Sequence, residues 1–238
     1  MCDNQSMNTS LKILIPVYNE EKTIIKILEK ISVSCEQIKN YEVIVVDDGS
    51  TDQTNNQLLS HSNLYSSLLT LPQNRGKGYA IIKGLENVKQ GFVLIQDADL
   101  EYDPREIPNL WNEIKKNSAE VLLTSRLSGS KTTRVHYFWH KVGNRIITLF
   151  FNICNNTTFT DIYSGYLIFD ISKIDLSKLR FFGWGQQAEI LTYLVKNSSK
   201  IYETPISYYG RTYEEGKKIR FTSVFKVFMA IIVTRFRP

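Results

Sequence analysis

Two short acidic motifs could do chemistry in this 238-residue chain, and each follows a mostly apolar stretch. Asp97-Ala98-Asp99 comes after residues 92–96, and Asp47-Asp48 comes after residues 42–46. Both stretches are typical of β-strands, so the carboxylates are expected at the carboxyl edge of a parallel sheet, where ligands bind. Carboxylates, water and substrate phosphates are the ligands that Mg²⁺ and Mn²⁺ prefer. We therefore predict a Mg²⁺ or Mn²⁺ site at Asp97 and Asp99.

Each motif also has a purely structural interpretation. A D-x-D sequence can be a solvated acidic turn, and short motifs carry a real risk of false matches. Asp48 and Asp52 lie in a turn-rich segment, where aspartate commonly stabilises turns and caps helices. A carboxylate at this place can also accept hydrogen bonds from ribose hydroxyls or a base N–H. The two roles can coexist.

Strand-like and helix-like segments alternate along the first half of the chain, which predicts a mainly parallel sheet flanked by helices. Strands are expected over residues 11–17, 42–46, 66–71, 92–96, 120–125 and 165–169. Helices are expected after the caps Asn19 and Asp103, near residues 53–60 and 79–88, and over much of 135–154. Glu20 and Glu21 would occupy the first turn of the helix capped by Asn19, where acidic side chains favour the helix dipole.

Composition places the chain among ordinary globular proteins. Hydrophobic residues make up 42% and charged residues 22%, which argues against disordered and fibrous classes. The formal charge of +5 is moderate, and we predict no nucleic-acid partner. Three scattered cysteines without a C-x-x-C motif suit a reducing compartment. The first ten residues lack the apolar core of a signal peptide, and no apolar stretch approaches the ~20 residues of a membrane span, so a cytoplasmic location is expected.

Four motifs resemble those of family 2 glycosyltransferases in order and spacing. They are Pro16-Val17-Tyr18-Asn19-Glu20, Asp47-Asp48-Gly49-Ser50-Thr51-Asp52, Asn74-Arg75-Gly76-Lys77-Gly78 and Asp97-Ala98-Asp99. The chain most resembles the polyprenyl-phosphate sugar synthases, the group of dolichyl-phosphate mannose synthase and bactoprenol glucosyltransferase. That resemblance continues through Thr124-Ser125-Arg126, residues 161–165 and residues 211–219.

The resemblance implies a GT-A fold, a Rossmann-like, mainly parallel sheet flanked by helices, over residues 11–222. A polar tail (residues 1–10) would precede it, and an amphipathic segment (residues 223–238) would follow. The implied donor-site residues surround the nucleoside, the diphosphate and the metal: Pro16, Tyr18, Glu20, Asp47, Asp48, Lys77, Asp97, Ala98 and Asp99.

Arg126, Arg211 and Lys217 would hold phosphates of the donor or acceptor, which suits the bidentate geometry of guanidinium. A solvated basic surface is the alternative for these cations. Arg211 with Gly216, Lys217 and Lys218 is further predicted to form a mobile loop that closes on a phosphate.

The acceptor can be narrowed by asking whether it needs a catalytic base. A sugar hydroxyl needs one, whereas a phosphate monoester is already largely ionised at neutral pH. Residues 184–189 lack the Glu-Asp pair and the Q-x-x-R-W signature that the resemblance would imply for relatives acting on hydroxyls. This absence favours a polyprenyl phosphate acceptor. Glu189 remains a candidate base or acceptor-site ligand, and a structural ion pair at a helix start is an equal alternative.

A terminal helix and a segment in the middle of the chain could bind a membrane surface. A terminal helix would cluster Val224, Phe225, Phe228, Ile231, Ile232 and Phe236, with Lys226, Arg235 and Arg237 on its remaining surface. Such a helix can lie in the headgroup layer, and residues 139–151 have a similar mix. Either segment could instead be core or a dimer surface.

The leading hypothesis is a metal-dependent, inverting transfer of a hexose from a UDP- or GDP-sugar to polyprenyl phosphate, by a protein peripherally bound to the cytosolic membrane face. One alternative is a family 2 transferase that acts on a glycan hydroxyl. The other is a noncatalytic module that binds nucleotide-sugars.

Overall fold

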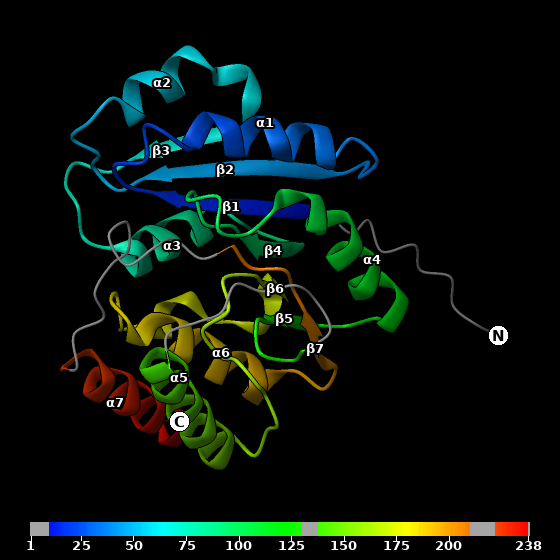
Figure 1. Cartoon of the computed structure of the whole chain (residues 1–238), viewed down its shortest axis with the longest axis vertical. Helices are drawn as coiled ribbons and strands as arrows, with labels where there is room; N and C mark the ends of the chain where they lie inside the picture. The colour runs from blue at the N-terminus through cyan, green and yellow to red at the C-terminus, as the bar shows by residue number, and fades with distance from the viewer. Residues whose placement is uncertain (1–9, 130–137, 210–221, 238) are drawn as a thin grey trace.

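The computed structural model describes residues 10–129, 138–209 and 222–237, which contain a seven-stranded sheet (Figure 1). The strand order is β3-β2-β1-β4-β6-β5-β7, and β6 alone among these strands runs antiparallel to its neighbours. The strands are β1 (Leu11–Val17), β2 (Tyr41–Asp47), β3 (Ser67–Thr70), β4 (Phe92–Ile95), β5 (Val121–Ser125), β6 (Leu167–Asp170) and β7 (Ile201–Pro205). The predicted mainly parallel sheet is confirmed.

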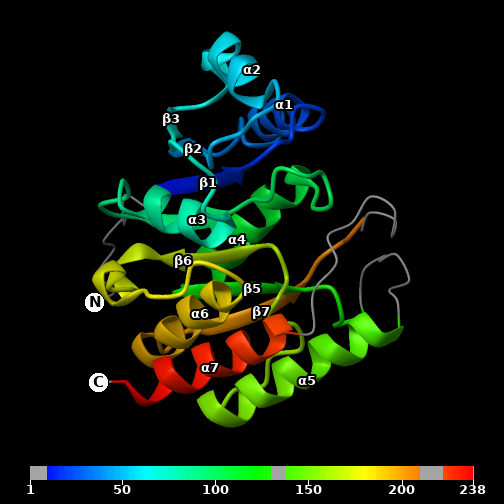
Figure 2. The same cartoon turned by 90° about the vertical axis from the view of Figure 1, so that its left-hand side faces the viewer.

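Helices cover both faces of this sheet. One hydrophobic core contains residues of α1, α2 and α4, and the other contains residues of α3, α5, α6 and α7. Figure 2 shows α3, α6 and α7 in front of the sheet. The helices are α1 (Ile24–Ser34), α2 (Thr54–Ser60), α3 (Lys77–Leu85), α4 (Ile107–Asn117), α5 (Phe138–Asn155), α6 (Gly185–Asn197) and α7 (Thr222–Phe236). Short 3₁₀ helices are η1 (Ser62–Leu64), η2 (Pro104–Glu106), η3 (Ile171–Lys173) and η4 (Leu176–Lys178).

The central strands are apolar on both faces because both faces are covered. On β1, Leu14 belongs to one core, whereas Ile13 and Ile15 belong to the other, and all three are fully buried. Each such side chain stabilises the fold by about 1.5–3 kcal/mol. Gly84 lets α3 pack closely on β1, since a Cβ there would lie 2.2 Å from Leu14 Cδ1. The first residue of α3, Lys77, lies at the carboxyl edge of the sheet, where it forms an ion pair with Asp97.

Two helix starts differ from expectation. Asn19 does not cap α1, which begins at Ile24 instead. Asn19 has a φ of 53°, and its side-chain oxygen accepts a hydrogen bond from Thr51 N, so tertiary contacts hold this loop out of the helix. Asp103 does accept a hydrogen bond from Arg105 N, but the turn that it caps is the 3₁₀ helix η2 that leads into α4.

The predicted C-terminal helix forms, but its apolar residues do not share one face. Ile231 is fully buried in the core, whereas Ile232 and Phe236 are exposed on the outside of α7. Likewise, Phe151 of α5 is fully buried and Trp139 is 76% exposed. Both helices therefore have a core face and an apolar outer face. Within the described ranges, neither these nor the other helices combine the length and apolarity needed to cross a bilayer.

Candidate active site

The carboxyl ends of β1, β2 and β4 meet at one edge of the sheet. Val17 pairs with Asp47 across β1 and β2, and Leu14 pairs with Ile95 across β1 and β4. The segments that follow these strands carry the predicted donor-site residues. Strand β5 is parallel to β4, because both are antiparallel to β6, so the segment after β5 emerges at the same edge.

Hydrogen bonds join the loop after β1 to the turn after β2. Asn19 N donates to Ser50 Oγ at 3.0 Å, and Glu20 N donates to Thr54 Oγ1 at 2.9 Å. The Glu20 carboxylate itself accepts a hydrogen bond from a threonine hydroxyl of its own loop. Tyr18 is 40% exposed at the start of this loop, whereas Pro16 is buried within β1. Contact of Pro16, Tyr18 and Glu20 with a nucleoside stays a prediction.

Asp47 and Asp48 are both buried and both stabilise turns. Asp47 accepts hydrogen bonds from Ser50 N at 2.9 Å and from an α2 asparagine amide at 2.8 Å. Asp48 accepts hydrogen bonds from Arg75 N and, at 2.7 Å, from Gly76 N. Asp48 therefore ties the turn after β2 to the loop before α3. Both carboxylates thus stabilise turns, as the structural interpretation predicted. Their nucleoside-binding role stays a prediction.

Asp97 and Asp99 follow β4 on either side of Ala98, which is buried in the core at 5% exposure. Lys77 Nζ forms an ion pair with Asp97 Oδ1, and the Asp97 side chain is 19% exposed. Asp99 Oδ1 accepts a hydrogen bond from Glu101 N at 3.2 Å. In the part of the chain that the structure describes, no three histidine, cysteine, aspartate or glutamate side chains gather as a metal site. Two hard carboxylates fit a divalent ion whose other ligands are water and a diphosphate.

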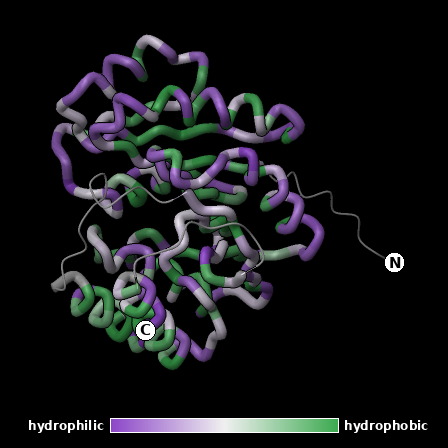
Figure 3. The backbone as a smooth tube through the Cα atoms, in the orientation of Figure 1, coloured by the Kyte–Doolittle hydropathy of each residue, from purple (hydrophilic) through white to green (hydrophobic). Residues whose placement is uncertain are grey.

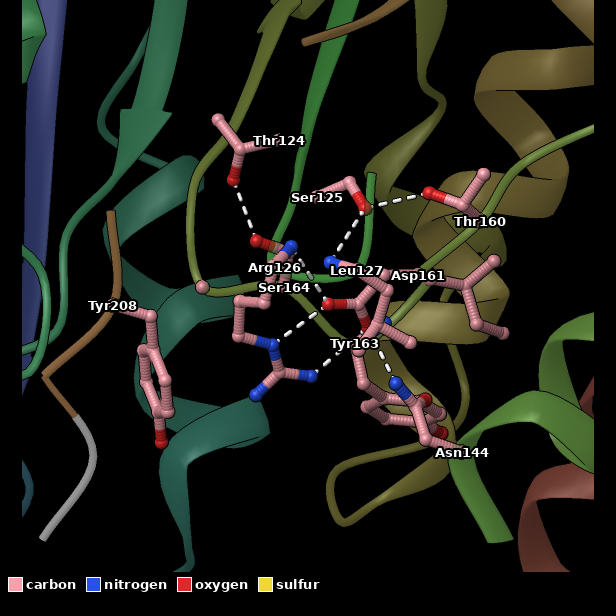
Figure 4. A network of polar contacts seen from close by, with 12 residues as sticks. Thr124, Ser125, Arg126, Leu127, Asn144, Thr160, Asp161, Tyr163, Ser164 and Tyr208 are labelled. Atoms are coloured by element: carbon pink, nitrogen blue, oxygen red, sulfur yellow. Dashed lines mark hydrogen bonds and ion pairs between the residues drawn. The ribbon is translucent and has the colours of Figure 1, made fainter. Parts of the chain in front are cut away.

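Arg126, directly after β5, is held by the carboxylate of Asp161 in a bidentate pair (Figure 4). Arg126 Nε lies 2.7 Å from Asp161 Oδ2, and Nη2 lies 2.9 Å from Oδ1. Asp161 is fully buried, and Arg126 is 17% exposed. Burial alone would raise the pKa of Asp161, but the Arg126 charge and its hydrogen bonds hold that pKa below its usual value. The Tyr208 ring stacks 5.2 Å from the guanidinium carbon.

Three further elements support this pair, and no sequence motif pointed to them. Asn144 of α5 donates a hydrogen bond to Asp161 Oδ1 at 2.6 Å. Glu203 of β7 accepts hydrogen bonds from Thr160 N at 2.9 Å and from Asp161 N at 3.3 Å. Gln187 of α6 donates to two carbonyl oxygens of the segment that contains Asp161. An asparagine, a glutamate and a glutamine far apart in sequence carry no spacing signal that could have identified them.

Glu189 lies on α6 at 1% exposure, and its carboxylate accepts hydrogen bonds from two backbone amides. Arg180 N and Phe181 N are the donors, at 3.0 and 2.9 Å. Burial raises the pKa of Glu189. The contacts favour a structural role, although its partners are backbone amides rather than the expected ion pair.

We expect Glu189→Gln to destabilise the fold but to leave turnover per folded molecule within about twofold, because an amide can replace only part of the acceptor capacity that the two N–H groups use. A buried group left without its partner costs about 1–3 kcal/mol, which thermal unfolding would detect. A loss of kcat above about 100-fold with unchanged unfolding would show instead that Glu189 is a base.

Arg211, Lys217 and Lys218 lie outside the described residues, so their predicted phosphate loop stays a prediction.

Comparison with known proteins identifies a family and several relatives of this chain. The pattern of the family described as glycosyl transferase family 2 matches residues 12–173. A low-salt glycan biosynthesis hexosyltransferase, Agl6 of Haloferax volcanii, is 28% identical over 85% of this chain and 48% of its own length. A dolichyl-phosphate beta-glucosyltransferase, ALG5D of Trichomonas vaginalis, is 29% identical over 93% of this chain and 71% of its own length.

An undecaprenyl-phosphate 4-deoxy-4-formamido-L-arabinose transferase of Aeromonas hydrophila is 39% identical over 43% of this chain and 34% of its own length. This chain thus spans about half the length of the first of these relatives and about a third of the last. Glucosyl-3-phosphoglycerate synthase from Mycobacterium tuberculosis, solved with Mn²⁺, UDP and glucosyl-3-phosphoglycerate, has a TM-score of 0.67 at 17% identity. The match covers 96% of this chain and 80% of that one, so the two share a fold.

Proposed function

Because the chain belongs to glycosyl transferase family 2, we propose that it transfers a hexose from a UDP- or GDP-sugar to polyprenyl phosphate, with inversion at the anomeric carbon. The observation that carries the proposal is that two carboxylates and a guanidinium follow strands at the same edge of the sheet. Asp97 and Asp99 follow β4, and the paired guanidinium of Arg126 follows the parallel strand β5. Relatives named for dolichyl and undecaprenyl phosphate support this acceptor class.

The donor diphosphate would lie against the segment after β4. Asp97 and Asp99 would hold a Mg²⁺ or Mn²⁺ ion, which supplies positive charge to the leaving diphosphate. Lys77 Nζ, already beside Asp97, would add a second cation to the same leaving group. Tyr18, exposed after β1, would contact the nucleoside. Asp48 would act indirectly, because it fixes the loop from which Lys77 follows.

The acceptor phosphate would bind Arg126. Asp161 takes the Nε and Nη2 side of the guanidinium, so Nη1 remains for an anion, and Figure 4 shows this side of Arg126 toward Tyr208. A phosphate monoester needs no base, since its second pKa is about 6. A reaction without a base is consistent with the Glu189 carboxylate, which accepts hydrogen bonds from two backbone amides. The in-line attack would then place a phosphate oxygen on the anomeric carbon as the nucleoside diphosphate leaves.

The proposed reaction is tested with labelled UDP- and GDP-sugars, Mg²⁺ or Mn²⁺, and polyprenyl phosphate in detergent. Label should enter the chloroform phase only when donor, metal and lipid phosphate are all present. Label transferred only to soluble glycans would establish the hydroxyl-acceptor alternative. Donor binding by calorimetry without any turnover would establish a noncatalytic nucleotide-sugar module.

The outer surfaces of α5 and α7 support a membrane-bound location. Figure 3 shows the apolar character of this region. The Phe150 and Phe228 rings, with centroids 4.6 Å apart, join the two helices. Neither helix contains aspartate or glutamate, whereas basic residues occur on both. The apolar face consists of Phe138, Trp139, Ile146, Leu149, Ile153, Phe225, Met229, Ile232, Val233 and Phe236. An apolar surface with positive charge and no negative charge fits an anionic lipid headgroup layer.

We expect Trp139→Asp and Met229→Asp to weaken binding to anionic phospholipid vesicles by about tenfold or more, because each places a charge in the apolar face. Co-sedimentation with vesicles measures the effect. Val33→Asp and Leu59→Asp are matched controls, since these residues are 69% and 62% exposed on α1 and α2. Equal binding by all four variants would contradict the assignment. A variant that changes molar mass by light scattering, without changing vesicle binding, would identify a dimer surface instead.

A further inference from the structure

Helix α5 holds the segment containing Asp161 through three polar side chains at four-residue spacing. Asn144, Thr148 and Asn152 lie on one side of the helix, because residues four apart occupy the same face. Thr148 Oγ1 accepts a hydrogen bond from Ile162 N at 3.4 Å. Asn152 Nδ2 donates a hydrogen bond to Phe159 O at 2.8 Å, and Asn152 Oδ1 accepts one from Phe159 N at 3.1 Å. One side of α5 is thus bonded to residues 157–162 along two full turns.

We call Asn144, Thr148 and Asn152 the α5 ladder. Asn144 is the ladder residue that contacts the Arg126–Asp161 pair. Its Nδ2 lies 2.6 Å from Asp161 Oδ1, the oxygen that also accepts from Arg126 Nη2. Figure 4 shows Asn144 and Arg126 approaching Asp161 from different sides. The backbone amides of Arg126 and Tyr163 also donate to this carboxylate, and one orientation satisfies all of these donors together. The direction of the Arg126 guanidinium is therefore coupled to α5.

The same helix contributes the apolar face on its outer side. Ile146, Leu149 and Ile153 are 54–72% exposed, while the ladder residues face the protein. Helix α5 thus stands between the proposed lipid-contacting surface and the proposed phosphate-binding guanidinium. A flexible arginine would otherwise sample many rotamers, and ordering it in advance reduces what phosphate binding must order.

We propose that Asn144 is a positioning residue for transfer to the lipid phosphate: it fixes Asp161, which presents the Nη1 side of Arg126 to the acceptor. This inference rests on the proposed function, in which Arg126 binds the acceptor phosphate. It assigns Asn144 no contact with substrate. Its effect is specific to the acceptor, since the donor residues Lys77, Asp97 and Asp99 lie on other elements.

Asn144→Ala should raise the KM for polyprenyl phosphate by up to about tenfold and change kcat by less than about threefold, because phosphate binding must then order a guanidinium that the wild type holds in place beforehand. The Kd of the nucleotide-sugar, measured by calorimetry, should stay within about twofold. Asn144→Asp keeps the shape but places a second carboxylate against Asp161, so it should raise the acceptor KM at least as much as the alanine variant.

Asn155→Ala is the matched control on the same helix. The Asn155 amide is also buried, but it donates to Phe151 O of its own helix rather than to the Asp161 segment. It should leave the acceptor KM unchanged. If Asn144 only filled space, an Asn144→Leu variant, which has similar volume but no hydrogen-bond donor, would keep the wild-type acceptor KM, and that result would overturn the proposal.

A measurement without substrate separates this inference from the proposed reaction. In ¹⁵N-arginine spectra, the Arg126 Nε–H resonance should exchange slowly with water in the wild type and faster in Asn144→Ala, but not in Asn155→Ala. Unchanged exchange in Asn144→Ala would overturn the coupling whatever the enzyme does. Faster exchange in a protein that makes no lipid-linked product would support the coupling and refute the proposed acceptor.

Discussion

Asp97→Asn and Asp99→Asn should each lower the formation of lipid-linked sugar by about 100-fold or more while thermal unfolding stays nearly unchanged. Each substitution removes a charged oxygen ligand from the edge where the leaving diphosphate is proposed to bind. The structural cost is small, because the Asp97–Lys77 pair is partly exposed and such pairs contribute about 0–1 kcal/mol. Turnover with Mg²⁺ and with Mn²⁺, at saturating donor, measures the loss.

A binding experiment separates loss of metal from loss of fold. In the wild type, Mg²⁺ or Mn²⁺ together with the correct nucleotide-sugar should raise the unfolding temperature, and the Asp97 and Asp99 variants should lose this rise. Asp175→Asn is the control, since this carboxylate caps the distant 3₁₀ helix η4. Comparing UDP- and GDP-sugars in the same scans identifies the donor nucleobase. A double variant with wild-type turnover would refute the metal site.

Sequence patterns predicted the sheet because its central strands are buried on both faces and therefore appear as apolar runs. The start of α1 could not be predicted in this way. Asn19, Glu20 and Glu21 have the residue types of a helix cap and first turn, yet their polar groups bond to residues 50–54. These contacts join residues about thirty positions apart. Local propensity contains no information about such competing partners.

The motif residues at the sheet edge were predictable because each follows a recognisable strand. Their partners were not. Asp161 lies in a motif, but its carboxylate accepts hydrogen bonds from Asn144 on α5, from Arg126 and from the backbone amide of Tyr163. Glu203 on β7 accepts a hydrogen bond from the Asp161 backbone amide. Glu189 illustrates the converse, since a glutamate near a helix start suits several roles. Its burial and the hydrogen bonds that it accepts from two backbone amides favour a structural role.

Asp161→Ala should both destabilise the protein and abolish measurable transfer, because it leaves Arg126 without its counter-charge. Removing one partner of a buried ion pair costs about 3–5 kcal/mol, and the 17% exposure of Arg126 places this pair near the lower limit. Chemical denaturation measures the cost. It should be pH-dependent. The pKa of Asp161 is lowered in the folded state. The ionised carboxylate therefore adds to the free energy of unfolding above its unfolded pKa of about 4, and this contribution is lost as the pH falls through the folded-state pKa.

A double substitution separates the stabilising role of the pair from its role in transfer. Arg126→Met combined with Asp161→Leu removes both charges and fills similar volume, so it should recover the part of the stability lost in Asp161→Ala that comes from the unpaired Arg126 charge. Transfer to polyprenyl phosphate should remain down by about 100-fold or more, because no guanidinium remains for the acceptor phosphate. If the double variant regained transfer together with stability, the pair would be only a structural link between β5 and the segment before β6, and the acceptor phosphate would bind elsewhere.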